Sequence, residues 1–341
     1  MNIEMTYQNT KQVLIKRPKG MPDDNCWEIK KETLSYLKKN EVLIKVKYLS
    51  IDPYMRGRMN EGLSYASPLK LGDTMVGESV GEVIESKSNL YKVGDILCAH
   101  KGWQTLIKTK DTDLSLYKVN SKNLPISLYL GSLGMPGRTA YFGLNKVAKP
   151  KKGETVVVSA ASGAVGSVVG QLAKSYGCRV IGIAGGTEKC SYVKEILKFD
   201  ECIDYKSDHL KKNLEKACNN GIDIYFENVG GSVTRAVAPL LNHRSRVPIC
   251  GFISQYNNDD LLSSETPFHI LKNLNTKSIY RFFVVHEWVD EFESATDELT
   301  EMVLNKKILY KETITKGFEN APQALRDVLS GKNFGKQIIE I

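Results

Sequence analysis

A glycine-rich turn between two apolar segments is the part of the sequence best suited to chemistry. The stretch 155–174 begins with the β-branched run Val156–Val158 and passes through the turn ASGAVG (161–166) into an apolar helical segment. This pattern predicts a strand, a tight turn and a helix. The first N–H groups of such a helix have no partner within it and lie at the positive end of the helix dipole, so the turn can bind a phosphate group.

The glycines of this stretch have separate roles. Gly163 lets the main chain approach a pyrophosphate, whereas Gly166 and Gly170 let the helix pack closely against the sheet. Ala161 replaces the first glycine of the usual G-x-G-x-x-G pattern, so the match is partial and an ordinary buried strand and helix remains an alternative. Residues 155–173 carry no charge, but three glycines and the change from strand to helix argue against a membrane span.

The end of the second strand indicates the choice between the two nicotinamide cofactors. An acidic residue there binds the ribose 2′-hydroxyl of NAD, and a nearby cation suits the 2′-phosphate of NADP. Here the strand ends IAGGTEK (183–189), with no acid at its tip. Gly186 offers a main-chain donor and Lys189 a positive charge. Glu188 is interpreted as a carboxylate in the first turn of a helix, where the helix dipole favours it. NADP is therefore expected; a solvated surface lysine is the alternative for Lys189.

Composition limits the class of protein. The 341 residues suit about two domains, and 42% hydrophobic with 25% charged residues is ordinary for a globular protein. The first residues, MNIEMTYQNTKQ, are polar and do not resemble a secretory signal, so a cytoplasmic location is expected. The net charge of +8 comes from dispersed lysines that often neighbour acids. No nucleic-acid partner and no membrane association are therefore expected.

The cysteines and histidines show no metal-binding pattern. Seven cysteines occur without a C-x-x-C pair, and five histidines occur without H-E-x-x-H spacing. These counts argue against a disulfide framework and against a zinc site.

The order of elements predicts two kinds of structure. Residues 13–107 alternate polar and apolar side chains between turns, which is typical of an all-β part such as a small barrel or rolled sheet. From Thr155 onward strands alternate with helices, which predicts a doubly wound parallel sheet in an α/β fold. We expect a helix from about 135 to 147, a helix over 188–197 and a charged helix over 286–305. A strand is expected over 308–314, a helix over 318–329 and a last strand over 337–341.

With these features together, the chain resembles a known family. The β-rich part, the Met135-Pro136-Gly137 helix, the nucleotide unit and the C-terminal return resemble the medium-chain dehydrogenases/reductases. The similarity is closest to the zinc-independent branch of prostaglandin reductases, leukotriene B4 12-hydroxydehydrogenases and NADP-dependent alkenal double-bond reductases. It runs from about residue 42 to 339, and its motifs are DPYMR (52–56), GMPG (134–137), AASGAVGS (160–167), ENVGG (227–231), CGFISQYN (250–257) and GFENAP (317–322).

The resemblance implies a domain arrangement and a metal-free reaction. A GroES-like catalytic domain would be formed by both chain ends, residues 1–130 with 306–341, and a Rossmann NADP-binding domain by residues 131–305. Zinc-using relatives carry an early catalytic cysteine and a Gly-His-Glu segment, but this chain has Asp52-Pro53-Tyr54 and Gly77-Glu78. The structural zinc lobe is also missing, so no metal is expected. Members of the family are commonly dimers, and a homodimer is expected.

The resemblance also assigns site residues. Lys189 and Tyr205 would contact the adenosine 2′-phosphate beside Gly186, and Asn333 would hold the carboxamide. The substrate would lie between the domains, with Tyr54 and Tyr256 on opposite walls as catalytic residues. The remaining cofactor-binding positions are Met135, Thr139, Ser162, Gly163, Ala164, Val165, Asn228, Cys250, Phe283 and, again, Tyr256.

The expected reaction is transfer of a hydride from NADPH to the β-carbon of an α,β-unsaturated aldehyde or ketone, followed by protonation of the enolate. Tyr256 would donate a hydrogen bond to the developing oxyanion. The alternatives are an NADPH:quinone reductase and a non-catalytic NADPH-binding protein that binds RNA or has a structural role. The substrate pocket is expected to include the loops 60–68 and 255–266.

Overall fold

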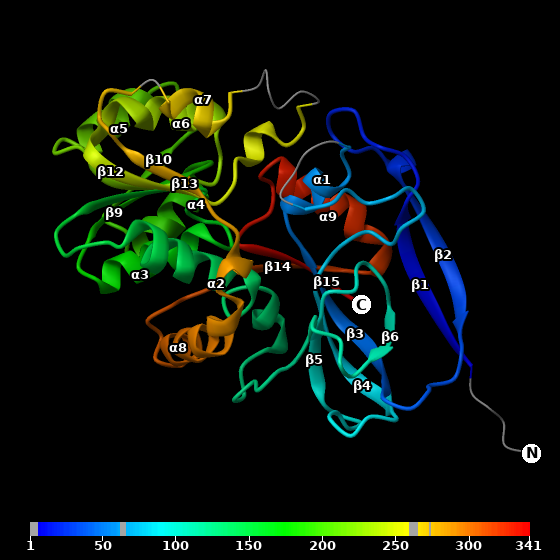
Figure 1. The fold of residues 1–341 in the computed structure, drawn as a ribbon. Coiled ribbons are helices and arrows are strands. Elements are labelled where there is room, and N and C mark those ends of the chain that lie inside the picture. The colour runs from blue at the N-terminus through cyan, green and yellow to red at the C-terminus, as the bar shows by residue number, and fades with distance from the viewer. Residues whose placement is uncertain (1–5, 62–65, 259–264, 273) are drawn as a thin grey trace, which may run out of the picture. The chain divides into compact units, whose positions relative to one another are not determined.

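The computed structural model describes residues 6–61, 66–258, 265–272 and 274–341 (Figure 1). These residues form two compact units. The first unit consists of Met1–Leu130, Thr313–Asn333 and Gln337–Ile341, and the second of Gly131–Glu312 and Phe334–Lys336. The division into functional domains at 130/131 and 305/306 remains a prediction.

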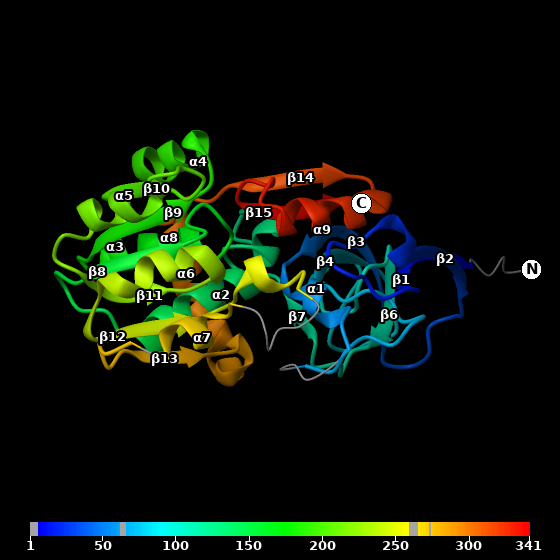
Figure 2. The ribbon, with the colours of Figure 1, turned by 90° about the horizontal axis from the view of Figure 1, so that it is seen from above.

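A parallel sheet forms the centre of the second unit. Among the described residues it has six strands in the order β10-β9-β8-β11-β12-β13, and Figure 2 shows this order from above. The sequence order reverses between β8 and β11, which is the point where doubly wound sheets bind nucleotides. The strands are β8 (Thr155–Ser159), β9 (Arg179–Ala184), β10 (Glu201–Asp204), β11 (Ile222–Phe226), β12 (Leu241–Ile249) and β13 (Ile279–Phe282).

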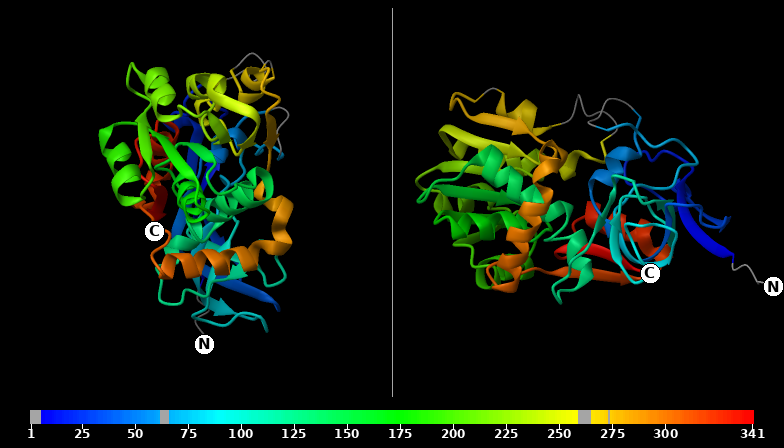
Figure 3. Two further views of the ribbon diagram at one scale, coloured as in Figure 1. Left: turned by 90° about the vertical axis from the view of Figure 1, so that its left-hand side faces the viewer. Right: turned by 60° about the horizontal axis from the view of Figure 1, so that its bottom comes forward.

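Helices cover both faces of this sheet, because right-handed crossovers change face where the strand order reverses. One face carries α3 (Gly166–Ser175) and α4 (Thr187–Ser191), with α2 (Met135–Phe142) packed on α3. The helix α8 (Phe292–Leu304), orange in Figure 3, packs on α2. Above the other face in Figure 1 lie α5 (Leu210–Ala217), α6 (Gly231–Val237) and α7 (Pro267–Leu271).

Two glycines bring α3 close to the sheet end. A Cβ on Gly166 would lie 2.4 Å from the carbonyl oxygen of Ala160, and one on Gly170 would lie 1.8 Å from the ring of Phe199. Neither position has room for a side chain. Gly166 thus permits the predicted close approach of α3 to the end of β8, whereas Gly170 packs on Phe199, which precedes β10, and not on a strand as predicted.

The first unit is built on an antiparallel sheet. In its described part seven strands pair, with the path β14-β15-β3-β4-β5-β7 and with β6 beside β3. The strands are β3 (Glu41–Ile51), β4 (Ser79–Ser86), β5 (Ile96–Ala99), β6 (Leu106–Lys110), β7 (Leu116–Lys118), β14 (Glu312–Lys316) and β15 (Lys336–Glu340). A separate hairpin pairs β1 (Tyr7–Leu14) with β2 (Trp27–Leu34), and the helices are α1 (Tyr54–Arg58) and α9 (Ala321–Leu329). The predicted fold class, a doubly wound sheet plus a β-rich domain, is confirmed.

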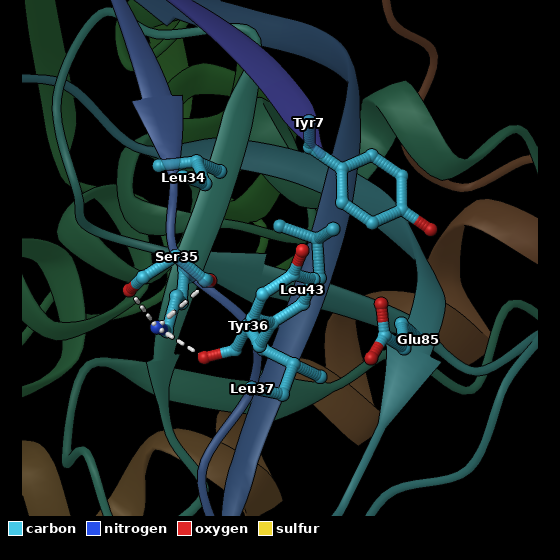
Figure 4. A pocket seen from close by; sticks show the side chains of 8 residues that line it. Tyr7, Leu34, Ser35, Tyr36, Leu37, Leu43 and Glu85 are labelled. Atoms are coloured by element: carbon cyan, nitrogen blue, oxygen red, sulfur yellow. Dashed lines mark hydrogen bonds between the residues drawn. The ribbon is translucent and has the colours of Figure 1, made fainter. Parts of the chain in front are cut away.

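A small cavity in the first unit lies beside Lys108 (Figure 4). The Lys108 ammonium donates hydrogen bonds to Ser35 O and Oγ at 3.0 and 2.8 Å and to Tyr36 O at 2.8 Å. The cavity volume of about 10 Å³ suits one water molecule. It is too small for a substrate or cofactor.

Four predicted elements differ from the observed ones. Residues 286–305 form a 3-10 helix, Val285–Glu291, and then α8, because the Trp288 main chain leaves helical angles where its ring stacks on Phe142 at 5.3 Å. The helix expected over 188–197 is α4 followed by a π-helix, Tyr192–Ile196, and α2 likewise continues as a π-helix, Gly143–Ala148. The strand expected over 308–314 begins only at Glu312.

The late start of β14 follows from a contact with α3. Leu309 N–H donates to Gln171 Oε1 at 2.8 Å, and Gln171 Nε2 donates to Leu309 O at 2.9 Å. This segment is therefore bound to a side chain of α3 instead of to a strand.

Candidate functional site

The turn between β8 and α3 has the geometry of an anion site. Gly163, Ala164 and Val165 are partly exposed, whereas Ala161, Ser162 and Gly166 around them are buried. No side chain caps the start of α3. The N–H groups of Ser167, Val168 and Val169 bond to main-chain oxygens of the turn. Within the described residues, the N–H groups of 164–166 have no such partner, and those of Ala164 and Val165 lie in its partly exposed part, as a bound pyrophosphate requires.

Two glycines end the neighbouring strand β9. Gly186 has φ of +92°, which favours glycine, and its N–H donates to Asp204 Oδ1 at 2.8 Å. The expectation that this N–H is a donor for a phosphate is therefore wrong in this structure, because the Asp204 carboxylate already accepts it. A Cβ on Gly185 would lie 2.6 Å from the Tyr205 ring, so this ring rests directly on the glycine. The structure thus brings together Gly186, Tyr205 and, on the next helix, Lys189.

Lys189 is a partly buried cation. Burial lowers the pKa of its ammonium, the charge of Lys206 lowers it further, and the charge of Glu188 opposes the shift. An anion bound beside Lys189 would offset both the lost hydration and the repulsion from Lys206. The site therefore suits the 2′-phosphate of a dinucleotide better than a neutral ribose hydroxyl.

An aromatic cluster beside Lys189 comes from the C-terminal part of the chain and was missed by the sequence reasoning. The Lys189 Nζ lies 5.8 Å from the centre of the Phe334 ring, and the Lys311 Nζ lies 3.9 Å from the same centre. The Tyr192 ring meets Phe334 edge-on at 5.0 Å. The next residue, Gly335, forms an isolated bridge with Gly163 in the phosphate turn. One sequence signal could have revealed this cluster: an aromatic residue and a glycine, Phe334 and Gly335, directly follow the predicted cofactor residue Asn333.

A buried carboxylate organises the turn after β11. Glu227 is fully buried and accepts hydrogen bonds from Val229 N–H at 2.7 Å, Gly230 N–H at 3.1 Å and the hydroxyls of Ser159 and Thr234. Burial raises the pKa of this carboxyl although these donors lower it. Glu227 thereby holds the 227–231 turn against the end of β8. The motif ENVGG was identified in the sequence, but no role was predicted for Glu227.

Two predicted cofactor residues are attached to this network. The Asn228 side chain donates to Ser159 O at 2.7 Å, and its main-chain N–H donates to Ser159 Oγ at 2.8 Å. Cys250 N–H donates to Glu227 O at 2.9 Å. Burial and the Glu227 charge raise the pKa of the Cys250 thiol to about 12, so it is not a nucleophile at neutral pH.

Tyr256 lies in the same turn region. Its phenol oxygen accepts a hydrogen bond from Phe252 N–H at 3.4 Å, and its ring packs edge-on against Phe252 at 5.5 Å. A Cβ on Gly251 would lie 2.7 Å from that oxygen, so the phenol needs the glycine. An oxygen that accepts one hydrogen bond is polarised to donate another.

The other predicted residues of the second unit lie in more ordinary surroundings. Thr139 Oγ1 donates to Met135 O at 2.7 Å within α2. Phe283 is buried against Phe226 and Trp288, with ring centres 6.1 Å away in both cases. Its ring belongs to the core, so contact with a cofactor would come from its main chain.

Tyr54 and Asn333 belong to the first unit. Tyr54 OH lies 3.4 Å from His100 Nε2, a partner that the sequence reasoning did not identify. The helix that carries Tyr54 is fixed by the buried Arg56, whose guanidinium donates to Gly20 O at 2.8 and 3.2 Å. The catalytic and cofactor-binding roles of all these residues remain predictions.

The described residues include no group of three or more His, Cys, Asp or Glu side chains placed to hold a metal ion. No described helix has both the length and the apolar character needed to cross a bilayer. Of the loops expected to line a substrate pocket, residues 62–65 and 259–264 lie outside the described residues.

Comparison with known proteins places the chain among oxidoreductases. Residues 11–116 match the N-terminal domain of oxidoreductase, and residues 164–301 match the zinc-binding dehydrogenase family. An NADPH-dependent curcumin reductase of Escherichia coli is 42% identical over 341 residues, covering 99% of this chain and 98% of the relative. A 2-alkenal reductase (NADP(+)-dependent) of Nicotiana tabacum is 41% identical over 342 residues, covering 98% of both.

A solved structure agrees with the sequence relatives. The crystal structure of CurA in complex with NADPH from Vibrio vulnificus is 42% identical, with a TM-score of 0.91. The match covers 97% of this chain and 98% of that one.

Proposed function

The chain belongs to the medium-chain dehydrogenase/reductase family, and we propose that it uses NADPH to reduce the carbon–carbon double bond of α,β-unsaturated aldehydes and ketones. The observation that carries this proposal is the anion site formed by the start of α3 and by Lys189, Gly186 and Tyr205 at the ends of β9 and β10. Relatives over 40% identical along nearly the whole chain are named for NADPH-dependent reduction of such compounds.

The described residues fit NADPH. The partly exposed turn 163–165 suits a pyrophosphate, and the partly buried Lys189 suits a 2′-phosphate. When bound, NADPH supplies the hydride. The chain's own residues must orient it, and we propose that Asn228 and Cys250, which are bonded to the Glu227 network, contribute to this.

Tyr256 is proposed to stabilise the negative charge that develops on the substrate oxygen. Its phenol accepts a hydrogen bond from Phe252 N–H and stays protonated at neutral pH, since an ordinary tyrosine has a pKa of about 10. It can therefore donate a hydrogen bond throughout the reaction. Removing one such donor costs roughly 3 kcal/mol of transition-state stabilisation.

Tyr54 is proposed to contact the substrate from the first unit, with His100 as its positioning residue. The 3.4 Å separation between Tyr54 OH and His100 Nε2 allows the imidazole to orient the phenol. Arg56 keeps the short helix α1 in place. A homodimer is also proposed, from the family membership alone.

The direct test is oxidation of NADPH with and without crotonaldehyde, cinnamaldehyde and a conjugated ketone. Enal- or enone-dependent loss of NADPH absorbance, with the saturated carbonyl compound as product, supports the proposal. Reduction to the unsaturated alcohol would contradict it, because the hydride would have gone to the carbonyl carbon. Turnover with quinones and none with any enal or enone would replace it with quinone reduction.

A further inference from the structure

Two cysteines lie together beside the predicted 2′-phosphate site. Cys190 belongs to α4 and directly follows Lys189, while Cys202 belongs to β10, three residues before Tyr205. Both are partly exposed, whereas four of the seven cysteines are buried. The remaining partly exposed cysteine, Cys250, has a strongly raised thiol pKa. The pair has no role in the proposed reaction.

The register of the sheet places both sulfurs on one face. Cys202 is paired with Gly182 across β10 and β9, and its Sγ lies 3.3 Å from the position of a Cβ on Gly182. Val193 Cγ1 reaches the same position at 2.8 Å from the helix side. Cys190 and Val193 are three residues apart and so share one helix face. The missing side chain of Gly182 leaves space beside the Cys202 sulfur, on the face of β9 that is covered by the helical segment of Cys190 and Val193.

The Cys190 sulfur lies over the same strand as the Cys202 sulfur. Cys190 Sγ is 4.0 Å from the main-chain oxygen of Ala184, two residues along β9 from Gly182, beside which Cys202 Sγ lies. The two thiols are unequal: the neighbouring Cys202 side chain lowers the pKa of the Cys190 thiol, against burial, which raises it. The neighbouring Cys190 side chain, together with burial, raises the pKa of Cys202. Cys190 is thus the better nucleophile and Cys202 the resolving thiol, which is the arrangement of redox-sensing cysteine pairs.

We propose that Cys190 and Cys202 form a reversible disulfide with a hydroperoxide as oxidant, and that this disulfide weakens NADPH binding. The Cys190 thiolate attacks one peroxide oxygen, the O–O bond breaks, and the departing hydroxide takes a proton to become water. The Cys202 sulfur then loses its proton and attacks the Cys190 sulfenic acid, whose S–O bond breaks to release a second water. Two thiols are oxidised to one disulfide while one hydrogen peroxide is reduced to two waters.

The effect on NADPH follows from the connection of Cys190 to the site. A disulfide holds its sulfurs about 2.05 Å apart, closer than any two thiols that are not bonded, so the first turn of α4 must move toward β10. Cys190 N–H donates to Gly186 O at 3.1 Å, and Lys189 is the adjacent residue. Movement of Cys190 therefore displaces two residues of the predicted phosphate site. Only this effect on binding rests on the proposed function; disulfide formation does not.

Mass spectrometry tests the bond itself. The reduced protein is treated with hydrogen peroxide, remaining thiols are blocked with N-ethylmaleimide, and peptides are mapped without reduction. We expect a cross-linked pair of peptides containing Cys190 and Cys202, with a mass about 2 Da below the sum of the two reduced peptides. Cys190→Ser should abolish the cross-link, and Cys202→Ser should leave Cys190 as a sulfenic or sulfinic acid. The control Cys26→Ser, whose hydroxyl can replace the thiol bond to Asp23, should still form it. Recovery of both thiols as maleimide adducts after oxidation would overturn the proposal.

NADPH titration tests the consequence. We expect the Kd for NADPH to rise about tenfold in the disulfide form and to return after dithiothreitol. By linkage, saturating NADPH must disfavour the disulfide by the same factor. An unchanged Kd in protein that carries the cross-link would overturn the regulatory part. Failure to bind NADPH in the reduced form would instead contradict the proposed function, and so the two failures are distinguishable.

Discussion

The phenol of Tyr256 is the residue on which the proposed chemistry most depends. Changing Tyr256→Phe removes the O–H donor and keeps the ring against Phe252. We expect kcat for an enal to fall roughly a hundredfold, since a lost oxyanion donor costs roughly 3 kcal/mol. The KM for NADPH should change little. The control Tyr280→Phe alters a partly exposed tyrosine of the same unit and should be neutral. Steady-state kinetics decides, and full activity of Tyr256→Phe would remove this residue from the mechanism.

We propose that Lys189 determines the preference for NADPH over NADH. Lys189→Ala should raise the KM for NADPH tenfold or more and leave that for NADH nearly unchanged, because a hydrogen bond to a charged group contributes roughly 1.5–3 kcal/mol. The matched control is Lys194→Ala, five residues further on, whose ammonium pairs with Glu201 at 2.9 Å. Equal increases for NADPH and NADH in Lys189→Ala would place the 2′-phosphate elsewhere.

Glu227 makes stability depend on pH. Burial raises the pKa of its carboxyl above the ordinary value of 4.5, so the folded protein holds this proton more tightly than the unfolded chain does. The resulting stabilisation is complete below that ordinary value and is lost as pH rises through the folded-state pKa. We therefore expect wild type to lose free energy of unfolding relative to Glu227→Gln as pH rises from about 4.5. Urea unfolding of both proteins across this range measures it; a difference that is constant with pH would contradict the assignment.

At the scale of elements, α3 packs without spare volume against Phe199, which follows the π-helix Tyr192–Ile196. A Cβ on Gly170 would overlap the Phe199 ring, so Gly170→Ala should cost about 1–3 kcal/mol of unfolding free energy by overpacking. Phe199→Leu removes the overlapping atoms and should partly restore stability in the double variant. Denaturant unfolding of the two single variants and the double variant gives the coupling energy. Purely additive effects would mean that the two residues are not in contact.

The elements that sequence could predict are those whose signal is local. The β-branched run at 156–158 and the glycine turn after it specify a strand and a helix start by themselves, and both are present. The segment 308–311 looks like a strand, but Gln171, far away in the chain, binds its main chain at Leu309. Likewise the ring of Trp288 bends a helix because it stacks on Phe142. Such partners are not visible in a periodic pattern.

The candidate site likewise contains residues that a local signal predicts and residues that come together only on folding. Gly186, Lys189 and Tyr205 follow from the strand ends and from the family motif, and the structure brings them together. Phe334 and Lys311 were missed because they lie over a hundred residues further along the chain and meet Lys189 and Tyr192 only after folding. The partner of Tyr54, His100, was not predicted, because a single imidazole outside a metal-binding spacing carries no sequence signal.

At the scale of the whole molecule, binding of NADPH at the proposed phosphate site should raise the free energy of unfolding of the second unit. A ligand that binds only the folded state at a hundred times its Kd adds about 2.7 kcal/mol to the free energy of unfolding. Thr155–Lys174, Gly186 and Lys189 all belong to the second unit. In calorimetry we therefore expect NADPH to raise the Tm of the transition that includes this unit. NADH at the same concentration should raise it less, because it lacks the phosphate that Lys189 is proposed to bind.

The variants separate this explanation from nonspecific stabilisation. In Lys189→Ala the shift with NADPH should fall to the level of the shift with NADH, while Lys194→Ala should keep the full difference. Peroxide-treated wild type should resemble Lys189→Ala, and dithiothreitol should restore it, if Cys190 and Cys202 act on the same site. Adenosine 2′,5′-bisphosphate, which has the phosphate without the nicotinamide, should reproduce part of the NADPH shift. Equal shifts with NADPH and NADH in wild type would show that the anion site, although well formed, does not select the cofactor.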